Sequence, residues 1–155
     1  MSALKSFRLA IDLTTRQRDQ ANQNLMLVQR AHSFAQDQLT QLEIYAQETS
    51  AKWTAAAQTG TTTELMRHHY QFMERLQHAI GLQSGVIENS NRKLDAARRV
   101  VLAAEFRLAG LTQVLKKKQA TIDVVQSRRE QKQMDEFASL RSGQAARESA
   151  SGDQL

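Results

Sequence analysis

Residues 57–64 read AQTGTTTE, and this short polar stretch decides the fold because it separates two long apolar repeats. Gly60 favours the C-cap of a preceding helix, since glycine readily adopts the left-handed conformation found there. Thr61 or Thr62 can cap the start of a second helix, and Glu64 then falls near its first turn. One turn with a helix on each side predicts a helical hairpin.

The first repeat predicts a helix from about residue 3 to 57. The 155-residue chain contains no proline, the residue that interrupts helix interiors most strongly. Coiled-coil helices carry apolar residues at positions a and d of a heptad labelled a to g. With Leu4 at position a, twelve of sixteen a and d positions are apolar. These positions are Leu4, Phe7, Ile11, Thr14, Arg18, Ala21, Leu25, Val28, His32, Ala35, Leu39, Leu42, Ala46, Thr49, Trp53 and Ala56.

The second repeat predicts a helix from about residue 63 to 140. With Met73 at position a, thirteen of sixteen a and d positions are apolar. Gly81 and Gly85 lie close to the polar positions Gln83 and Ser90, where we expect bending or weak pairing. The positions are Met73, Leu76, Ile80, Gln83, Ile87, Ser90, Leu94, Ala97, Val101, Ala104, Leu108, Leu111, Leu115, Lys118, Ile122 and Val125.

Folding the chain at the turn predicts antiparallel partners whose residue numbers add up to about 118. The second helix then extends past the first by roughly 20 residues, or about 30 Å at 1.5 Å per residue. We call residues 116–137 the overhang. Its apolar side chains have no helix to cover them, which predicts a binding site, a frayed end being the alternative. Residues 141–155 are small and polar, and we expect a disordered tail.

Composition narrows the classes of function. Aromatic residues are only 5% of the chain, which suits a coiled-coil seam better than a globular core. The absence of cysteine excludes a disulfide framework, and no apolar run is long enough to span a membrane, so we expect a cytoplasmic protein.

The net charge is +5, and residues 61–130 hold the excess with twelve basic and seven acidic side chains. A solvated helix face is the plainer interpretation of that charge.

Enzyme and cofactor motifs are missing from the sequence. It contains no P-loop, no GxSxG and no dinucleotide-binding fingerprint, so we predict a non-enzyme without cofactors. Glu64 and His68 have i, i+4 spacing, but no metal-ligand cluster accompanies them, and exposed polar residues are the better interpretation. His32, at a seam position, is interpreted as a polar marker of register.

Two aromatic residues are predicted to meet beside the seam near the turn. Residues at position g face one another along one side of an antiparallel pair, which places Tyr45 beside Phe72 and Gln38 beside Ala79. We call Gln38, Leu42, Tyr45, Phe72, Leu76 and Ala79 the flank patch. A docking surface and a locally widened core are equally compatible with this geometry.

Several segments resemble the FliJ family. QKQMDEF at residues 131–137 resembles the ending of FliJ proteins, and YQFMERLQHAI at residues 70–80 resembles the segment that follows their turn. Gln38, Leu42 and Tyr45 follow the family pattern before the turn. The resemblance implies a component of the bacterial flagellar type III export apparatus, an antiparallel coiled coil similar to the central stalk of rotary ATPases.

The resemblance also implies partners and the residues that contact them. Its terminal end would enter the hexameric ring of the export ATPase FliI, and it would connect this ring to the membrane export gate protein FlhA and bind export chaperones, at the flagellar base. The gate-binding residues carried over are the flank patch, where Thr49 and Gln83 depart from the family pattern at its edges. The ATPase end implied comprises Leu4, Phe7, Ile11, Lys116, Lys117, Lys118, Ile122, Val125, Met134 and Phe137.

Two other functions remain compatible with the residues. A self-associating scaffold would use the same heptads, because two long helices can also pair between chains. A basic helical nucleic-acid binder would use the run Lys116–Lys118 with Arg128 and Arg129. No nucleic-acid module or nearby stacking aromatic supports the second alternative.

Overall fold

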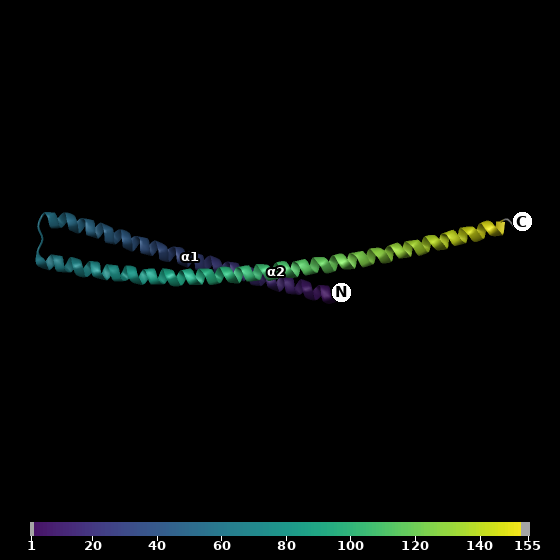
Figure 1. Cartoon of the computed structure of the whole chain (residues 1–155), viewed down its shortest axis with the longest axis horizontal. Helices are drawn as coiled ribbons and strands as arrows, with labels where there is room; N and C mark the ends of the chain where they lie inside the picture. The colour runs from purple at the N-terminus through teal and green to yellow at the C-terminus, as the bar shows by residue number, and fades with distance from the viewer. Residues whose placement is uncertain (1, 153–155) are drawn as a thin grey trace. The chain divides into compact units, whose positions relative to one another are not determined.

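The computed structural model describes residues 2–152 and contains two long helices, α1 (Ser2–Gln58) and α2 (Thr63–Gly152) (Figure 1). No strand occurs among these residues, so the predicted all-α helical hairpin is confirmed. The bounds of α1 differ by one residue at each end from the predicted 3–57, and α2 begins at the predicted residue 63.

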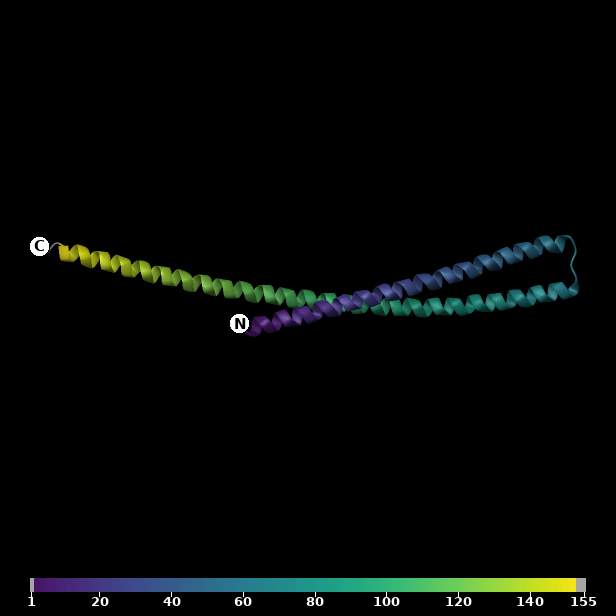
Figure 2. The same cartoon turned by 180° about the vertical axis from the view of Figure 1, so that it is seen from behind.

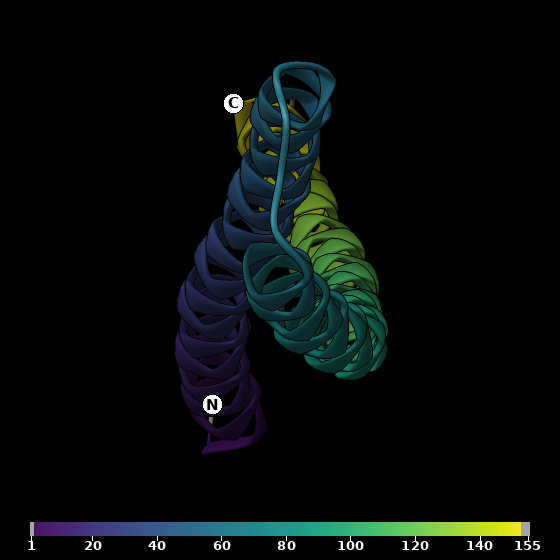
Figure 3. The same cartoon turned by 90° about the vertical axis from the view of Figure 1, so that its left-hand side faces the viewer.

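The connection between the helices, residues 59–62, is built as the sequence predicts. Gly60 has a φ of 115°, a left-handed conformation that is unfavourable for residues with a Cβ atom. The N–H of Gly60 donates to the carbonyl of Ala57 at 3.3 Å and closes the end of α1. Thr62 caps α2, because its Oγ1 accepts a hydrogen bond from the N–H of Leu65 at 3.2 Å. Figure 3 shows this connection from the end of the molecule.

The described residues group into two units, which we describe separately. The hairpin unit comprises residues 13–108, and the terminal unit comprises residues 2–12 together with residues 109–152. Within the hairpin unit α1 and α2 lie side by side and antiparallel, as Figures 1 and 2 show from opposite sides.

The core of the hairpin unit is the predicted seam. Every a and d position from Thr14 to Trp53 and from Met73 to Leu108 is buried or half-buried. Ala56 is the exception at the turn, since it is exposed while Ala57 is half-buried. The most buried side chains are small, with Ala35 and Ala97 5% exposed and Ala104 4% exposed. The larger side chains of Leu76, Leu94 and Val101 are also buried, at 7% exposed. The seam is therefore narrow and rich in small residues.

The register of the hairpin unit lies close to the prediction, and contacts across the seam have residue numbers that add up to between 117 and 122. The rings of Tyr45 and Phe72 are in contact, and their residue numbers add up to 117. His32 pairs with Ser90, giving 122 instead of 118.

The terminal unit has one covered part and one uncovered part. Leu4, Phe7 and Ile11 of α1 are half-buried, as are Leu111 and Leu115 of α2. After Gln119 every described side chain of α2 is exposed. The predicted overhang is thus present, and the predicted seam positions Ile122 and Val125 are exposed because no second helix covers them. Lys118 is exposed too, although its ammonium group contacts the Phe7 ring of α1.

The end of α2 differs from the expectation. The sequence predicts an end near residue 140 and a disordered tail at 141–155, whereas α2 continues to Gly152, and residues 153–155 lie outside the described residues. Residues 141–152 hold three alanines, at 145, 146 and 150, together with Arg141 and Gln144, all favourable in helices, and no proline. Polar composition alone does not end a helix, and Gly143 costs only about 1 kcal/mol.

We expect Thr62→Ala to lower the free energy of unfolding by about 1 kcal/mol, because the N–H of Leu65 loses its capping oxygen. Thermal unfolding followed by circular dichroism at fixed protein concentration measures the change. Thr61→Ala is the control, since the Thr61 hydroxyl only reaches the adjacent carbonyl of Thr62 at 3.4 Å. Equal melting temperatures for the two variants would contradict the cap.

Candidate partner-binding surfaces

The flank patch is assembled around one aromatic pair. The rings of Tyr45 and Phe72 lie 5.9 Å apart with an interplanar angle of 84°, an edge-to-face arrangement that is favourable for aromatic side chains. Tyr45 is 51% exposed and Phe72 is 39% exposed. The two rings therefore hold each other in place between α1 and α2 while part of their surface stays open to a partner.

The remaining residues of the flank patch form its floor and its edge. Leu76 is buried, Leu42 and Ala79 are half-buried, and Gln38 is exposed. Leu42, Tyr45 and Gln38 line a shallow hollow together with Gln41 and Gln83. The structure thus combines an apolar floor, two accessible rings and amide groups within a few turns of both helices.

Gln83 of α2 forms hydrogen bonds to α1 at the edge of the flank patch. Its Nε2 donates to the backbone carbonyl of Ala35 at 2.8 Å and to Oε1 of Gln38 at 3.3 Å. The sequence predicted weak pairing at this polar seam position. Instead, the amide replaces apolar contact with hydrogen bonds across the seam, and it orients Gln38 at the surface. Thr49, at the other edge, is half-buried.

His32 and Ser90 form a second polar contact across the seam. His32 Nδ1 lies 2.7 Å from Ser90 Oγ, within hydrogen-bond distance, and the imidazole tautomer decides which group donates. The sequence identified both residues as polar seam positions but did not pair them, because the predicted register placed His32 opposite residue 86. Two polar residues in otherwise apolar heptads are the signal that would have found the pair.

The other histidines do not form a metal site. Within residues 2–152, no three His, Asp or Glu side chains gather closely enough to hold a metal ion. His69 instead stacks on Trp53, with ring centroids 4.3 Å apart and an interplanar angle of 7°. His68 and His78 are exposed. The stack is a structural contact near the turn that the sequence did not predict.

The terminal unit brings part of the predicted ATPase end together. Lys118 Nζ lies 4.3 Å from the centroid of the Phe7 ring, a cation–π contact between α1 and α2. Leu4 and Ile11 are half-buried on the same helix as Phe7, and Lys116 and Lys117 are exposed. Apolar and basic groups therefore share this part of the chain.

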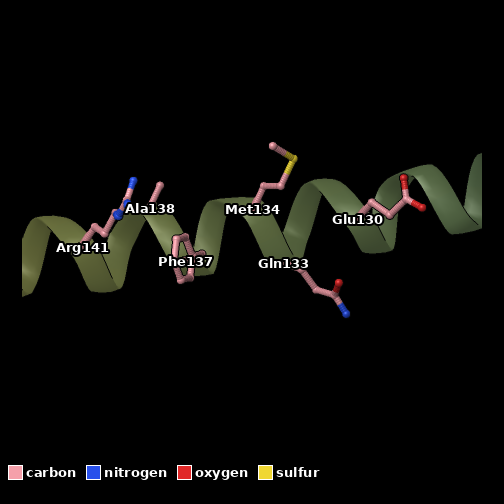
Figure 4. A pocket seen from close by; sticks show the side chains of 6 residues that line it. All are labelled: Glu130, Gln133, Met134, Phe137, Ala138 and Arg141. Carbon is pink, nitrogen blue, oxygen red and sulfur yellow. The ribbon is translucent and has the colours of Figure 1, made fainter.

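The rest of the predicted ATPase end lies on the uncovered part of α2. Ile122 and Val125 are 41% and 43% exposed, and Met134 and Phe137 are 69% and 61% exposed. Figure 4 shows Met134 and Phe137 in a shallow hollow on this single helix, with Arg141 beside the ring of Phe137 at 5.3 Å. Large apolar side chains without a covering helix indicate a surface for a partner. No helix among the described residues is long and apolar enough to cross a bilayer.

The comparison with protein families gives one match, and it covers nearly the whole chain. The model described as FliJ, flagellar FliJ protein, matches residues 4–147. The matched range includes the turn, the flank patch and the overhang. Comparison with curated proteins and with solved structures gives no match.

We expect Ser90→Ala to lower the free energy of unfolding by about 1–2 kcal/mol, because the half-buried imidazole of His32 loses its partner. Combining it with His32→Leu removes both polar groups and should restore wild-type stability or exceed it. Denaturant unfolding of the wild type, both single variants and the double variant gives the coupling between the two residues. A coupling of zero would show that the contact contributes nothing to stability.

Proposed function

This chain belongs to the FliJ family of flagellar proteins, and from this premise we propose that it connects the FliI-type export ATPase to the FlhA export gate. Family membership makes the chain a component of the flagellar protein export apparatus, and the family is not one of enzymes. In the proposal, the terminal unit binds and stimulates the ATPase ring, the flank patch binds the gate, and the protein also handles export chaperones. It works in the cytoplasm, peripherally associated with the membrane at the flagellar base.

The observation that carries the gate assignment is the exposed edge-to-face pair of Tyr45 and Phe72. Aromatic side chains are enriched at the centres of protein interfaces, where they bury large areas at little cost in conformational entropy. These two rings are already ordered by their mutual contact, and Leu76 beneath them is buried. Binding therefore requires little rearrangement of the hairpin.

The ATPase assignment is supported by the exposed apolar residues of the overhang. Ile122, Val125 and Phe137 lack a covering helix, and Lys116 and Lys117 add positive charge beside them. A ring that encloses this segment would bury the apolar side chains and bring acidic groups to the lysines. The hydrophobic effect then supplies affinity, and charge steers the encounter.

A mechanical link between the partners is supported by the continuity of α2. One unbroken helix, Thr63–Gly152, carries Phe72 and Leu76 of the flank patch as well as the whole overhang. The helix contains no proline, so its ladder of backbone hydrogen bonds is not interrupted by a missing donor. In the proposal, nucleotide-driven changes in the ring act on the gate through this helix.

We expect the full chain to stimulate ATP turnover by the FliI-type ATPase of the same organism in a saturable way. A variant that ends at Leu115 should lose the stimulation, because it lacks the exposed apolar residues 122–137 and the lysine run. The control is Tyr45→Ala, which leaves the terminal unit intact and should stimulate normally. Stimulation that survives the truncation would contradict the placement of the ATPase surface, and no stimulation by the full chain would contradict the ATPase role.

We expect Tyr45→Ala and Phe72→Ala each to weaken binding to the cytoplasmic domain of the FlhA-type gate protein by about tenfold or more. Each removes one ring of the pair and frees the other. Isothermal titration measures affinity, and circular dichroism verifies that helicity is unchanged. Tyr70→Ala is a matched control, since Tyr70 is 64% exposed but lies outside the flank patch. Wild-type affinity in both Tyr45→Ala and Phe72→Ala would contradict the assignment of the gate-binding surface.

A further inference from the structure

On α2, the flank of the hairpin unit that carries Phe72 is more apolar than the opposite flank. The contact of Tyr45 with Phe72 identifies the flank where residues at position g of both helices meet. On α2 the g positions of this flank are Phe72, Ala79, Val86, Lys93 and Val100, and all but Lys93 are apolar. The e positions of the opposite flank are Tyr70, Gln77, Ser84, Asn91 and Arg98, and all but Tyr70 are strongly polar. On α2 this asymmetry continues beyond the flank patch, whereas the g positions of α1 are mostly polar.

A second hollow lies on the apolar flank, beyond the flank patch. We call it the flank groove; it encloses about 320 Å³ and is lined by apolar Leu27, Ala31, Ala35 and Val86 and by polar Asn89 and Lys93. Leu27 is 62% exposed and Val86 is 51% exposed. Both are open to solvent, so the groove presents apolar surface that neither α1 nor α2 covers.

Gln83 links the flank groove to the flank patch through a hydrogen bond. It lines the hollow that contains Tyr45 and Leu42, and its Nε2 donates to the carbonyl of Ala35, which lines the flank groove. The side chain of Gln83 therefore lies at the junction of the two hollows, where hydrogen bonds to Ala35 and Gln38 set its position.

The spacing and charge of this surface define the shape of its occupant. Phe72, Ala79 and Val86 recur at seven residues, or roughly 10.5 Å along the helix, which matches the repeat of an apolar stripe on a third helix. Among the residues that line the flank groove, Lys93 is the one charged side chain. A helix lying there would be complementary if it carried an acidic residue beside Lys93.

We propose that the flank groove is a docking site for an amphipathic helix of the gate partner, with an acidic side chain of that helix facing Lys93. The inference rests on the proposed gate binding and extends the gate surface on α2 from Ala79 to Lys93, two heptads farther from the turn. The flank patch supplies aromatic contacts, and the flank groove supplies aliphatic contacts and one positive charge that selects the direction of the bound helix.

The test is titration of the gate protein's cytoplasmic domain into the full chain and its variants. Val86→Arg and Leu27→Arg place a charge in the flank groove from α2 and α1, and each should weaken binding by at least about tenfold. Ser84→Arg is the matched control, because Ser84 is exposed on the polar flank two residues from Val86, and it should bind like wild type. Lys93→Glu should weaken binding, while Lys93→Arg should not.

The outcomes separate this inference from the proposed function. Weak binding of Tyr45→Ala with normal binding of Val86→Arg and Leu27→Arg would overturn the flank groove and leave the gate assignment standing. Failure of the wild type to bind the gate domain would overturn both. Sedimentation that shows a wild-type dimer dissociated by Val86→Arg would make a second copy the occupant and also overturn the inference. Wild-type affinity in Lys93→Glu would overturn the acidic contact.

Discussion

A narrow apolar stripe on a long helix can be removed from water only by another helix that runs along it, and every other feature of the structure depends on this constraint. Seam residues such as Leu25 and Leu94 find their cover across the hairpin because the connection at residues 59–62 is short. The cover stops beside the first residues of α1, where Phe7 contacts Lys118. Since α2 has 90 residues and α1 has 57, part of α2 keeps its apolar side chains exposed, and the proposed ATPase surface follows from this difference in length.

Polar residues in the seam contribute less to stability than apolar residues would, but they determine the register in which the two helices pair. Ile or Leu at positions 32 and 90 would bury more apolar surface than the His32–Ser90 contact does. However, an all-apolar seam of small residues allows neighbouring registers of similar free energy, whereas a hydrogen bond across the seam is satisfied in only one of them. The contacts of Gln83 with Ala35 and Gln38 add a second such point. Gln83 contacts Gln38 of the flank patch, and Ser90 lines the flank groove, so these two contacts fix the register at both proposed docking surfaces.

Much of this organisation is predictable from the sequence, and the failures have identifiable causes. The heptad pattern predicted both helices and the Tyr45–Phe72 contact, because apolar periodicity and antiparallel geometry depend on few variables, and the polar stretch at residues 57–64 predicted the turn. The pairing of His32 with Ser90 was missed, since it depends on a shift of register that periodicity does not resolve. The end of α2 was placed too early because polar composition was interpreted as a break in the helix, although the residues there favour helix. The stack of His69 on Trp53 depends on side-chain rotamers that no spacing rule specifies. For the partner surfaces, the sequence predicted which apolar residues are exposed, whereas the flank groove could be identified only from the structure.

The seam also determines how the hairpin unit bears force. Among the described residues, no large side chain is completely inaccessible to water, and the buried side chains are spread along the seam from Thr14 to Ala104. A load that slides α1 along α2 strains all of these contacts at once, and each carries a small share. A load that pulls the helices apart at one end acts on one turn at a time, and the next turn opens only after the first has yielded. The same weak contacts therefore make a stiff element in shear and a compliant one in peeling, and the direction from which a partner pulls decides which of the two it meets.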